Sequence, residues 1–231
     1  MPKTKTAKQT TRPNAPGWLI TLEGGEGGGK TTQIVRLRDK LTRAGFQVVT
    51  LREPGGTVIS EQIREVVLSA KNIGMAFTTE VLLFQAARSQ IYREIVLPSL
   101  QAGKVVLMDR SRDSSSAYQG LVRGFGLELI EQLNNISTQN TYPNLTLLLD
   151  LPAEIGLERV AKNRPEKVDR LDLEAKDFHQ KVRQAYLQLA KTDQQDRWRV
   201  VNAGQTIDEV ADDLWRLVAK KLGVEIKQKT K

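Results

Sequence analysis

A glycine-rich run near the start of the chain, Gly-Gly-Glu-Gly-Gly-Gly-Lys-Thr at residues 24–31, restricts the fold more than any other segment. It fits the pattern G-x-x-x-x-G-K-[ST], in which glycines let successive amide N–H groups surround phosphate oxygens. An apolar segment at 18–22 precedes the run, and a helical pattern at 32–43 follows it. A merely flexible turn would not need these flanking elements. The segment therefore predicts a phosphate-binding loop between a buried strand and a helix N-terminus.

The residues of this loop have separate expected roles. The Lys30 ammonium would contact the β- and γ-phosphates of a nucleotide, and the Thr31 hydroxyl would coordinate Mg²⁺. The backbone amides would hold phosphate oxygens at the positive end of the helix. The residues expected to bind the nucleotide are Gly24, Gly25, Glu26, Gly27, Gly28, Gly29, Lys30, Thr31 and Thr32.

The composition restricts the class of protein. The chain has 231 residues, enough for one large domain or two small ones, and no cysteine, which excludes disulfides and thiolate metal sites. It has no apolar run of about twenty residues, so we expect no membrane span. The N-terminus lacks the apolar segment of a secretory signal. We therefore expect a soluble, cytoplasmic protein.

The net charge of +8 lies in the two ends of the chain. Residues 1–17 carry +4 and residues 220–231 carry +4, which leaves no net charge for residues 18–219. Such tails either anchor a protein to nucleic acid or an acidic surface, or are solvated and disordered. We favour the second interpretation and expect no nucleic-acid partner, because the charge lies outside the fold. The expected organisation is a disordered basic tail at 1–17, one domain at 18–222 and a second basic tail at 223–231.

Short apolar segments alternate with helical patterns along residues 18–222. Apolar strands separated by helices are typical of an α/β protein with a parallel sheet that helices cover on both faces. In such a sheet, ligands bind at the carboxyl ends of the strands. The predicted strands are 18–23, 47–51, 105–109, 145–151 and 199–201. The predicted helices are 31–44, 58–70, 79–101, 114–136, 153–163, 174–192 and 207–222.

Two segments place polar residues at predicted strand ends. The strand at 105–109 ends in Asp109, which could hold Mg²⁺ through water. Arg110 follows and could bind a phosphate, although a structural Asp–Arg pair is the alternative. The turn at 52–57, Arg-Glu-Pro-Gly-Gly-Thr, follows the strand at 47–51. It would direct Arg52 and Glu53 to the same edge of the sheet.

Phe84 and Arg88 are four residues apart in a helical pattern and therefore share a face. A ring beside a guanidinium suits a flat base with a carbonyl edge, but a core phenylalanine and a surface arginine would show the same spacing. A cation-rich stretch at 159–172 follows the strand at 145–151. It is either a solvated loop or, as we expect, a mobile lid that closes over phosphates.

Four ordered segments, 23–32, 52–57, 80–88 and 109–120, together resemble the thymidylate kinases of the bacterial type. The Arg-Glu-Pro-Gly-Gly-Thr turn and the Ala-Tyr-Gln-Gly ending of the last segment are the most specific motifs. The resemblance extends over residues 18–222. It implies the P-loop NTPase fold with a five-stranded parallel sheet, ATP as phosphoryl donor, Mg²⁺ as cofactor, thymidine monophosphate (dTMP) as acceptor and a homodimer.

The resemblance also implies roles for residues of the acceptor site. By position, Arg64 and Arg110 resemble the arginines that hold the acceptor phosphate. Phe84 resembles the ring that stacks on thymine, while Arg88 and Gln119 resemble the groups that bond the edge of the base. The expected dTMP-binding residues are Glu53, Arg64, Phe84, Arg88, Arg110, Ser114, Ser115, Tyr118 and Gln119.

Tyr118 resembles the tyrosine that lies against the deoxyribose, and 202–203 resembles the loop on the adenine side. The chain departs from the family pattern at two informative positions. Glu26 lies where the eukaryotic-type enzymes have an arginine, so the catalytic cation would come from the predicted lid. Arg112 lies where an aromatic residue or histidine is commoner, and would add a charge at the mouth of the site. The expected catalytic residues are Lys30, Arg110, Arg159, Arg164 and Glu26, and the expected metal ligands are Thr31 and Asp109.

Two other functions stay open at this point. One is a kinase for a different nucleoside monophosphate, which the base pocket of Phe84, Arg88 and Gln119 argues against. The other is a P-loop ATPase associated with nucleic acid, which would need a basic domain surface. His179, the only histidine, lies in the helical pattern at 174–192, and we expect it to be structural.

Overall fold

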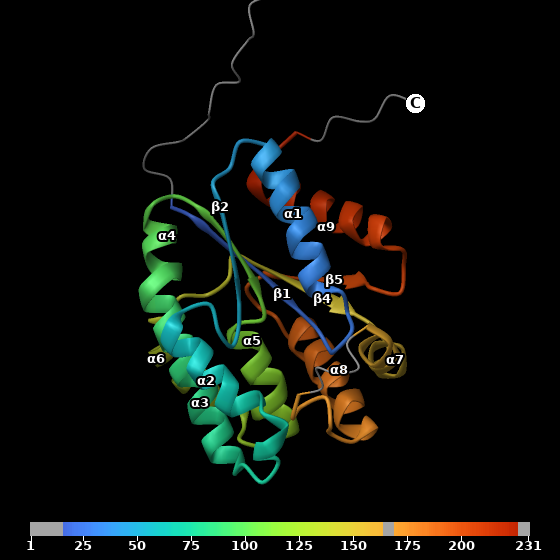
Figure 1. The fold of residues 1–231 in the computed structure, drawn as a ribbon. Helices are drawn as coiled ribbons and strands as arrows, with labels where there is room; N and C mark the ends of the chain where they lie inside the picture. Colours follow the sequence, from blue (N-terminus) through green and yellow to red (C-terminus); the bar gives the residue numbers. More distant parts are fainter. Residues whose placement is uncertain (1–15, 164–168, 226–231) are drawn as a thin grey trace, which may run out of the picture.

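The computed structural model describes residues 16–163 and 169–225 (Figure 1). Within these ranges a five-stranded sheet has the order β2-β3-β1-β4-β5, and every pairing is parallel. The strands are β1 (Trp18–Glu23), β2 (Val48–Arg52), β3 (Val105–Asp109), β4 (Leu145–Asp150) and β5 (Trp198–Asn202). The predicted α/β fold is confirmed, and no predicted strand end differs from the observed one by more than about one residue.

Helices cover both faces of the sheet (Figure 1). The α-helices are α1 (Lys30–Arg43), α2 (Val58–Leu68), α3 (Phe77–Ile91), α4 (Leu97–Gln101), α5 (Arg112–Ser115), α6 (Leu127–Thr138), α7 (Ala153–Asn163), α8 (Lys176–Lys191) and α9 (Ile207–Leu222). A 3₁₀ turn, η1 (Ala70–Asn72), and two π-helical segments, η2 (Tyr92–Val96) and η3 (Ser116–Val122), complete the described elements. None of the helices in these ranges combines the length and the hydrophobicity needed to cross a bilayer.

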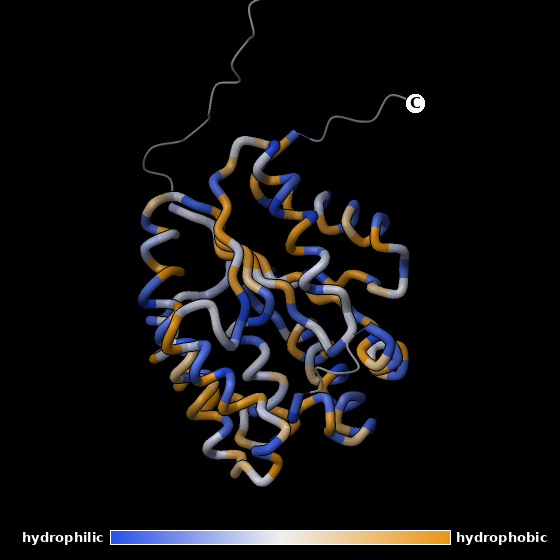
Figure 2. Tube along the Cα trace, viewed as in Figure 1, coloured by the Kyte–Doolittle hydropathy of each residue, from blue (hydrophilic) through white to orange (hydrophobic). Residues whose placement is uncertain are grey.

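The side chains of β1 show why both faces need a cover. Ile20 and Leu22 are fully buried in the core that α1 and α9 share with the sheet. Leu19 points the other way, into a core with Ile91 and Tyr92. Alternate residues of a strand face opposite sides, so a strand that is apolar at every position needs helices on both. Figure 2 shows the resulting hydrophobic centre, with hydrophilic residues distributed over the outer helices.

Two of the predicted helices are not continuous. The helix predicted at 79–101 begins at Phe77 and passes through η2 before α4. The helix predicted at 114–136 is divided, because α5 runs into η3 and α6 starts only at Leu127. The break contains Gly124 and Gly126, whose φ angles are 81° and 82°. These left-handed conformations suit glycine and end the helix. The two glycines therefore signal the break in the sequence, although the apolar periodicity continues through them.

The central strand supports a stability prediction. Leu107 of β3 is fully buried, whereas Val200 of the edge strand β5 is 51% exposed. Leu107→Ala should lower the free energy of unfolding by about 2–5 kcal/mol, since it removes buried methyl groups and leaves a cavity. The matched truncation Val200→Ala should change it by no more than about 0.5 kcal/mol. Urea unfolding followed by circular dichroism measures both. Equal losses in the two variants would contradict the layered core described above.

Candidate active site

A cavity of about 1080 Å³ opens at the carboxyl ends of the central strands. It is larger than a site for one small molecule usually requires. The phosphate-binding loop and α1 form one end, and α3, η3 and the turn after β2 form the other. The predicted site residues that line it are Glu26, Gly27, Gly28, Gly29, Lys30, Thr31, Thr32, Glu53, Arg64, Phe84, Arg88, Asp109, Arg110, Ser114, Ser115, Tyr118, Gln119 and Arg159.

The loop before α1 depends on glycine at defined positions. Gly24 and Gly27 have φ angles of 136° and 66°. A Cβ on Gly24 would lie 2.5 Å from the carbonyl oxygen of Leu149, and one on Gly27 would lie 2.1 Å from that of Gly156. The backbone of the loop therefore packs directly on β4 and α7, which no other residue type would permit at these two positions.

Lys30 opens α1 and is directed back over the loop. Its Nζ donates to the carbonyl oxygens of Gly24 and Gly25, at 3.1 and 2.9 Å. Burial lowers the pKa of Lys30, and the neighbouring Arg110 acts in the same direction, while nearby carboxylates oppose both. The ammonium thus lies at the loop where phosphate would bind, held by carbonyl dipoles rather than by a dedicated ion pair.

The two predicted metal ligands lie side by side. The Thr31 hydroxyl donates to Oδ2 of Asp109 at 2.7 Å. Parallel pairing of β1 with β3 opposes Leu22 to Asp109, and this register delivers the carboxylate to the loop. Hydroxyl and carboxylate oxygens suit Mg²⁺. The described residues contain no group of three or more His, Cys, Asp or Glu that could hold a metal ion. A cation bound here would therefore need phosphate and water oxygens in addition to these two side chains.

Arg110 joins the two ends of the cavity. Its guanidinium donates to the carbonyl oxygen of Gly24 at 3.0 Å, to Oε1 of Glu26 at 2.5 Å and to Oη of Tyr186 at 3.1 Å. Burial by itself would lower the pKa of Arg110, but Glu26 and other neighbours raise it well above its ordinary value. Tyr118 also donates to Oε1 of Glu26, at 3.0 Å. Arg110 is thus ion-paired with Glu26 rather than with Asp109, its neighbour in sequence.

The acceptor end is built around a buried arginine. Arg88 is 1% exposed, and its Nε donates to Oε2 of Glu53 at 2.7 Å. Its Nη1 donates to Ser115 at 2.8 Å. Phe84 lies one helical turn away and lines the same cavity, so the alternative of a surface arginine is excluded. Arg64 of α2 also lines the cavity and donates to the carbonyl oxygen of Pro54 at 2.8 Å.

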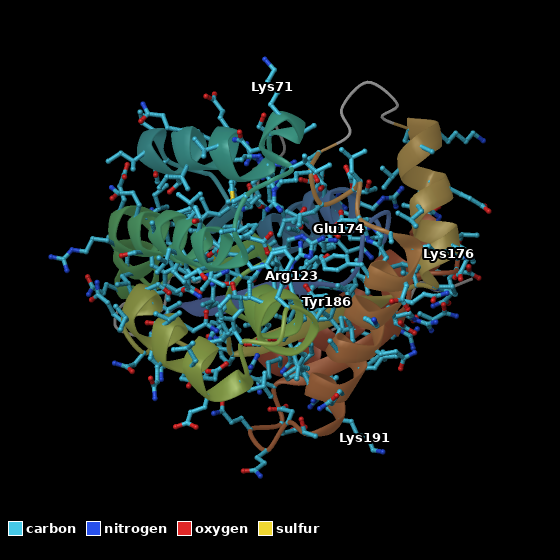
Figure 3. The ribbon with its side chains drawn as sticks, turned by 90° about the horizontal axis from the view of Figure 1, so that it is seen from below. Lys71, Arg123, Glu174, Lys176, Tyr186 and Lys191 are labelled. Carbon is cyan, nitrogen blue, oxygen red and sulfur yellow. The ribbon has the colours of Figure 1, made fainter. Side chains whose placement is uncertain are left out.

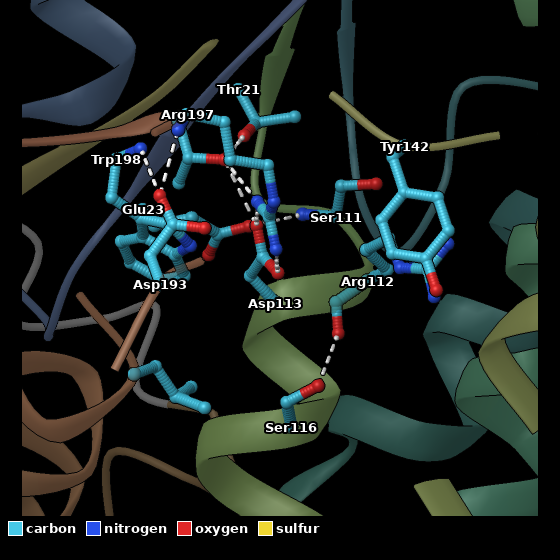
Figure 4. Close-up of polar contacts among 12 residues, drawn as sticks. Thr21, Glu23, Ser111, Arg112, Asp113, Ser116, Tyr142, Asp193, Arg197 and Trp198 are labelled. Atoms are coloured by element: carbon cyan, nitrogen blue, oxygen red, sulfur yellow. Dashed lines mark hydrogen bonds and ion pairs between the residues drawn. The ribbon is translucent and has the colours of Figure 1, made fainter. Parts of the chain in front are cut away.

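Glu23, to which the sequence analysis gave no role, bonds to residues beside the cavity. Glu23 ends β1, is fully buried, and accepts hydrogen bonds from the Ser111 amide at 2.8 Å, the Ser114 hydroxyl at 2.6 Å and the Tyr186 hydroxyl at 2.9 Å. Figure 4 shows Glu23 beside Ser111 and Asp113. Burial, with Asp113 adding to it, raises the pKa of Glu23 from 4.5 to about 7. The signal was an acid directly before Gly24 at the end of an otherwise apolar strand.

The structure places some of the residues considered in the sequence analysis away from the cavity or outside the described ranges. Arg112 is fully buried, bonds Glu131 at 2.6 Å and lies 3.6 Å from the centre of the Tyr142 ring. The expected charge at the mouth of the site is therefore wrong, because α5 turns this side chain into the protein. Arg159 lies in α7 and donates to the carbonyl oxygen of Ala203 at 3.2 Å. Arg164 lies outside the described residues. His179 is 5% exposed, with its ring 5.6 Å from that of Phe178, and it does not line the cavity.

The tails and the lid are only partly within the described ranges. The predicted tails fall mainly on residues 1–15 and 226–231, and the middle of the predicted lid falls on 164–168, all outside those ranges. Of the remaining lid residues, Arg170 is buried, and it donates to Glu80 at 2.6 Å and to the carbonyl oxygen of Val67 at 3.1 Å. This arginine is held in the protein interior and does not line the cavity.

The shifted pKa of Glu23 predicts a pH dependence of stability. Between its unfolded value near 4.5 and its folded value of about 7, the folded state binds the proton and the unfolded state releases it. Stability therefore falls as the pH rises through this window. Glu23→Gln, which cannot ionise, should remove roughly 2–3 kcal/mol of the decline between pH 5 and pH 8. Urea unfolding at intermediate pH values measures it, with the exposed Glu65→Gln as control. Parallel curves for wild type and Glu23→Gln would contradict the prediction.

Comparison with known proteins gives a consistent result. A family model described as thymidylate kinase matches residues 22–214. The chain is 44% identical to the thymidylate kinase of Clostridium novyi (strain NT), over 86% of this chain and 96% of the relative. It is 47% identical to that of Oenococcus oeni (strain ATCC BAA-331 / PSU-1), over 89% and 97%. The crystal structure of the Ehrlichia chaffeensis thymidylate kinase superposes with a TM-score of 0.70 at 30% identity, covering 88% of this chain and 99% of that one. The chain belongs to the thymidylate kinase family.

Proposed function

We propose that this protein transfers the γ-phosphoryl group of ATP to dTMP and yields thymidine diphosphate for dTTP synthesis. One observation carries the proposal beyond family membership. A single cavity joins the phosphate-binding loop to a pocket with an aromatic ring and a buried arginine, and Arg110 lies between them. Phosphoryl transfer requires donor and acceptor phosphates to meet in line inside a site that excludes water. A two-ended cavity of this kind satisfies that requirement.

At the donor end, the loop and Lys30 would bind the phosphates of ATP. The loop supplies amide N–H groups at the N-terminus of α1, and the Lys30 ammonium would exchange its two carbonyl partners for β- and γ-phosphate oxygens. Thr31 and Asp109 would hold Mg²⁺, which neutralises charge on the phosphates when bound. The loop at 202–203 and Arg159 would lie on the adenine side, since Arg159 bonds Ala203.

At the acceptor end, the predicted dTMP-binding residues would hold both the phosphate and the base of dTMP. Arg64 and Arg110 would hold the phosphate, with Ser114 beside Arg110. Phe84 would stack on thymine, and Tyr118 would lie against the deoxyribose. The remaining acceptor-site residues, Glu53, Arg88, Ser115 and Gln119, would hold or support the edge of the base. Because Glu53, Arg88, Ser115 and Gln119 are buried and already bonded to protein partners, little reorganisation would be needed before transfer.

The catalytic cation is assigned to the segment around α7. Glu26 occupies the loop position where an arginine could otherwise stabilise the transferring group, and it is bonded to Arg110 and Tyr118. We therefore assign the additional positive charge to Arg159, which lines the cavity, and to Arg164 of the proposed lid at 159–172. An arginine in this role contributes a factor of roughly a thousand or more to turnover.

We also propose that the protein forms a homodimer and acts in the cytoplasm. Exposed apolar side chains lie on α2, α3 and α6, among them Val66, Leu82 and Ile136, at 47%, 56% and 75% exposure. They support the expected homodimer, since such surface commonly packs against a second subunit. The substrates are soluble nucleotides, and we assign the enzyme to the cytoplasm with them. The alternative of a nucleic-acid-associated ATPase is less favoured, because residues 18–219 carry no net charge.

A panel of nucleoside monophosphates tests the function directly. With ATP and Mg²⁺, the purified protein should turn over dTMP with a kcat/KM at least about a hundredfold above those for GMP, AMP and CMP. A coupled assay for ADP measures each value under the same conditions. A higher kcat/KM for any of the three other nucleotides would assign the protein to a different monophosphate.

The lysine of the loop gives a second prediction. Lys30→Ala should lower kcat by about a hundredfold or more, because it removes a charge aimed at the transferring phosphate. Lys71→Ala is the matched control, since Lys71 is exposed and extends away from the protein in Figure 3. Circular dichroism establishes that both variants are folded. Near-normal turnover by a folded Lys30→Ala would remove the loop from the mechanism.

A further inference from the structure

We infer that Glu80 is a positioning residue that fixes the side-chain amide of Gln119, so that the amide carbonyl faces the nucleobase. The inference rests on the proposed function, because it concerns how the acceptor base is selected. Glu80 of α3 does not line the cavity, but Gln119 of η3 does. The Nε2 of Gln119 donates to Oε1 of Glu80 at 2.8 Å, and this bond joins the two elements.

The chemistry of Glu80 determines which end of the amide it receives. Its carboxylate also accepts from two guanidinium groups, at 2.6 Å from Arg170 and at 3.3 Å from Arg123. A carboxylate between two guanidinium groups has acceptors only, so the group facing it must be a donor. Rotating the Gln119 amide by half a turn would bring two acceptors together. The amide orientation therefore follows from the charge of Glu80.

Glu80 is itself held firmly in place. It is fully buried, and Arg170 is tied to the end of α2 through the carbonyl oxygen of Val67. Arg123 lies 4.1 Å from the ring centre of Phe77 and 4.5 Å from that of Phe178. The Arg123 side chain is 6% exposed and lies near the centre of the view in Figure 3, whereas Lys71 extends outward. Other contacts thus fix both guanidinium partners. If Gln119 moved, the Glu80 carboxylate could not move with it.

Because the amide nitrogen of Gln119 is bonded to Glu80, the amide oxygen is left to face the cavity. Within the described residues, no hydrogen bond to the Oε1 of Gln119 is found, so its acceptor remains for a ligand. Glu80, Phe84 and Arg88 follow one another at four-residue spacing on α3, which places the orienting carboxylate, the ring and the guanidinium on one face. Thymine offers its ring N3–H as a donor, whereas cytosine has an acceptor lone pair at N3. An acceptor held toward the base would bind the first and repel the second.

The substitution Glu80→Gln tests this inference. The two arginines would hold the carbonyl oxygen of the new amide and turn its NH₂ toward Gln119. The amide of Gln119 should then rotate and present its own NH₂ to the base. We expect the KM for dTMP to rise about tenfold with kcat within about threefold, and the ratio of kcat/KM for dTMP over dCMP to fall at least about tenfold. A structural loss alone would weaken both nucleotides alike.

A control separates the orienting role from the stability of the charge cluster. Glu174 also pairs with Arg123, and among the described residues no hydrogen bond joins it to Gln119. Glu174→Gln should therefore lower the thermal midpoint modestly, with the dTMP over dCMP ratio unchanged. If Glu80→Gln does not fold, Glu80→Asp keeps the charge for the arginines but withdraws the carboxylate from Gln119, and the same fall in the ratio is expected.

The outcomes distinguish this inference from the function on which it rests. Failure of the wild-type protein to phosphorylate dTMP would reject the proposed function. If the wild type is active and the folded Glu80 variant keeps the wild-type KM and the wild-type ratio, the orienting role is rejected while the function stands. A fall in the ratio in the Glu80 variant but not in Glu174→Gln would establish the role.

Discussion

The parallel pairing of β1 with β3 is the constraint on which the site depends. Leu22 opposes Asp109 in this register, so the glycine-rich loop after one strand and the Asp109-Arg110 pair after the other emerge together. The same register brings the Ser111 amide within 2.8 Å of Glu23. These two strands lie at the centre of the sheet, and both are almost entirely buried. The most protected part of the fold therefore fixes the position of the sheet edge that carries the candidate site.

Arginines of the cavity form ion pairs that hold their guanidinium groups at defined places. Arg110 is bonded to Glu26, and Arg88 to Glu53, each at or below 2.7 Å. The Arg88–Glu53 pair is buried and the Arg110–Glu26 pair partly buried, and such pairs add little net stability, because desolvation offsets much of the Coulomb attraction. Their use here is positional, since they fix planar guanidinium groups at the places where a phosphate and a base edge would lie. Glu23 extends the same principle one layer deeper, by holding Ser114 and Tyr186 around Arg110.

The fold was predicted correctly from the sequence, and most of the residues predicted for the site line the cavity. Their individual roles stay predictions. Strand–helix alternation and motif spacing depend on local pattern, which the chain displays openly. Sequence analysis assigned no role to Glu80 or Glu23 and suggested the wrong location for Arg112. The role of a buried charge depends on partners that are far away in the sequence. Glu80 meets Arg170, and Arg112 meets Glu131, through packing that no periodicity reports. The π-helical segments were also missed, since one additional residue per turn does not alter the apolar pattern enough to be seen.

The central claim is that one cavity holds donor and acceptor nucleotides with their phosphates meeting beside Arg110. The most direct measurement is a crystal structure of the protein with Mg²⁺, dTMP and a non-hydrolysable ATP analogue. The account predicts thymine against Phe84 with its ring N3 facing Gln119, and the terminal phosphate of the analogue at Lys30, with Arg110 in contact with the dTMP phosphate. Binding of dTMP outside this cavity, or with its phosphate directed away from the loop, would contradict the account.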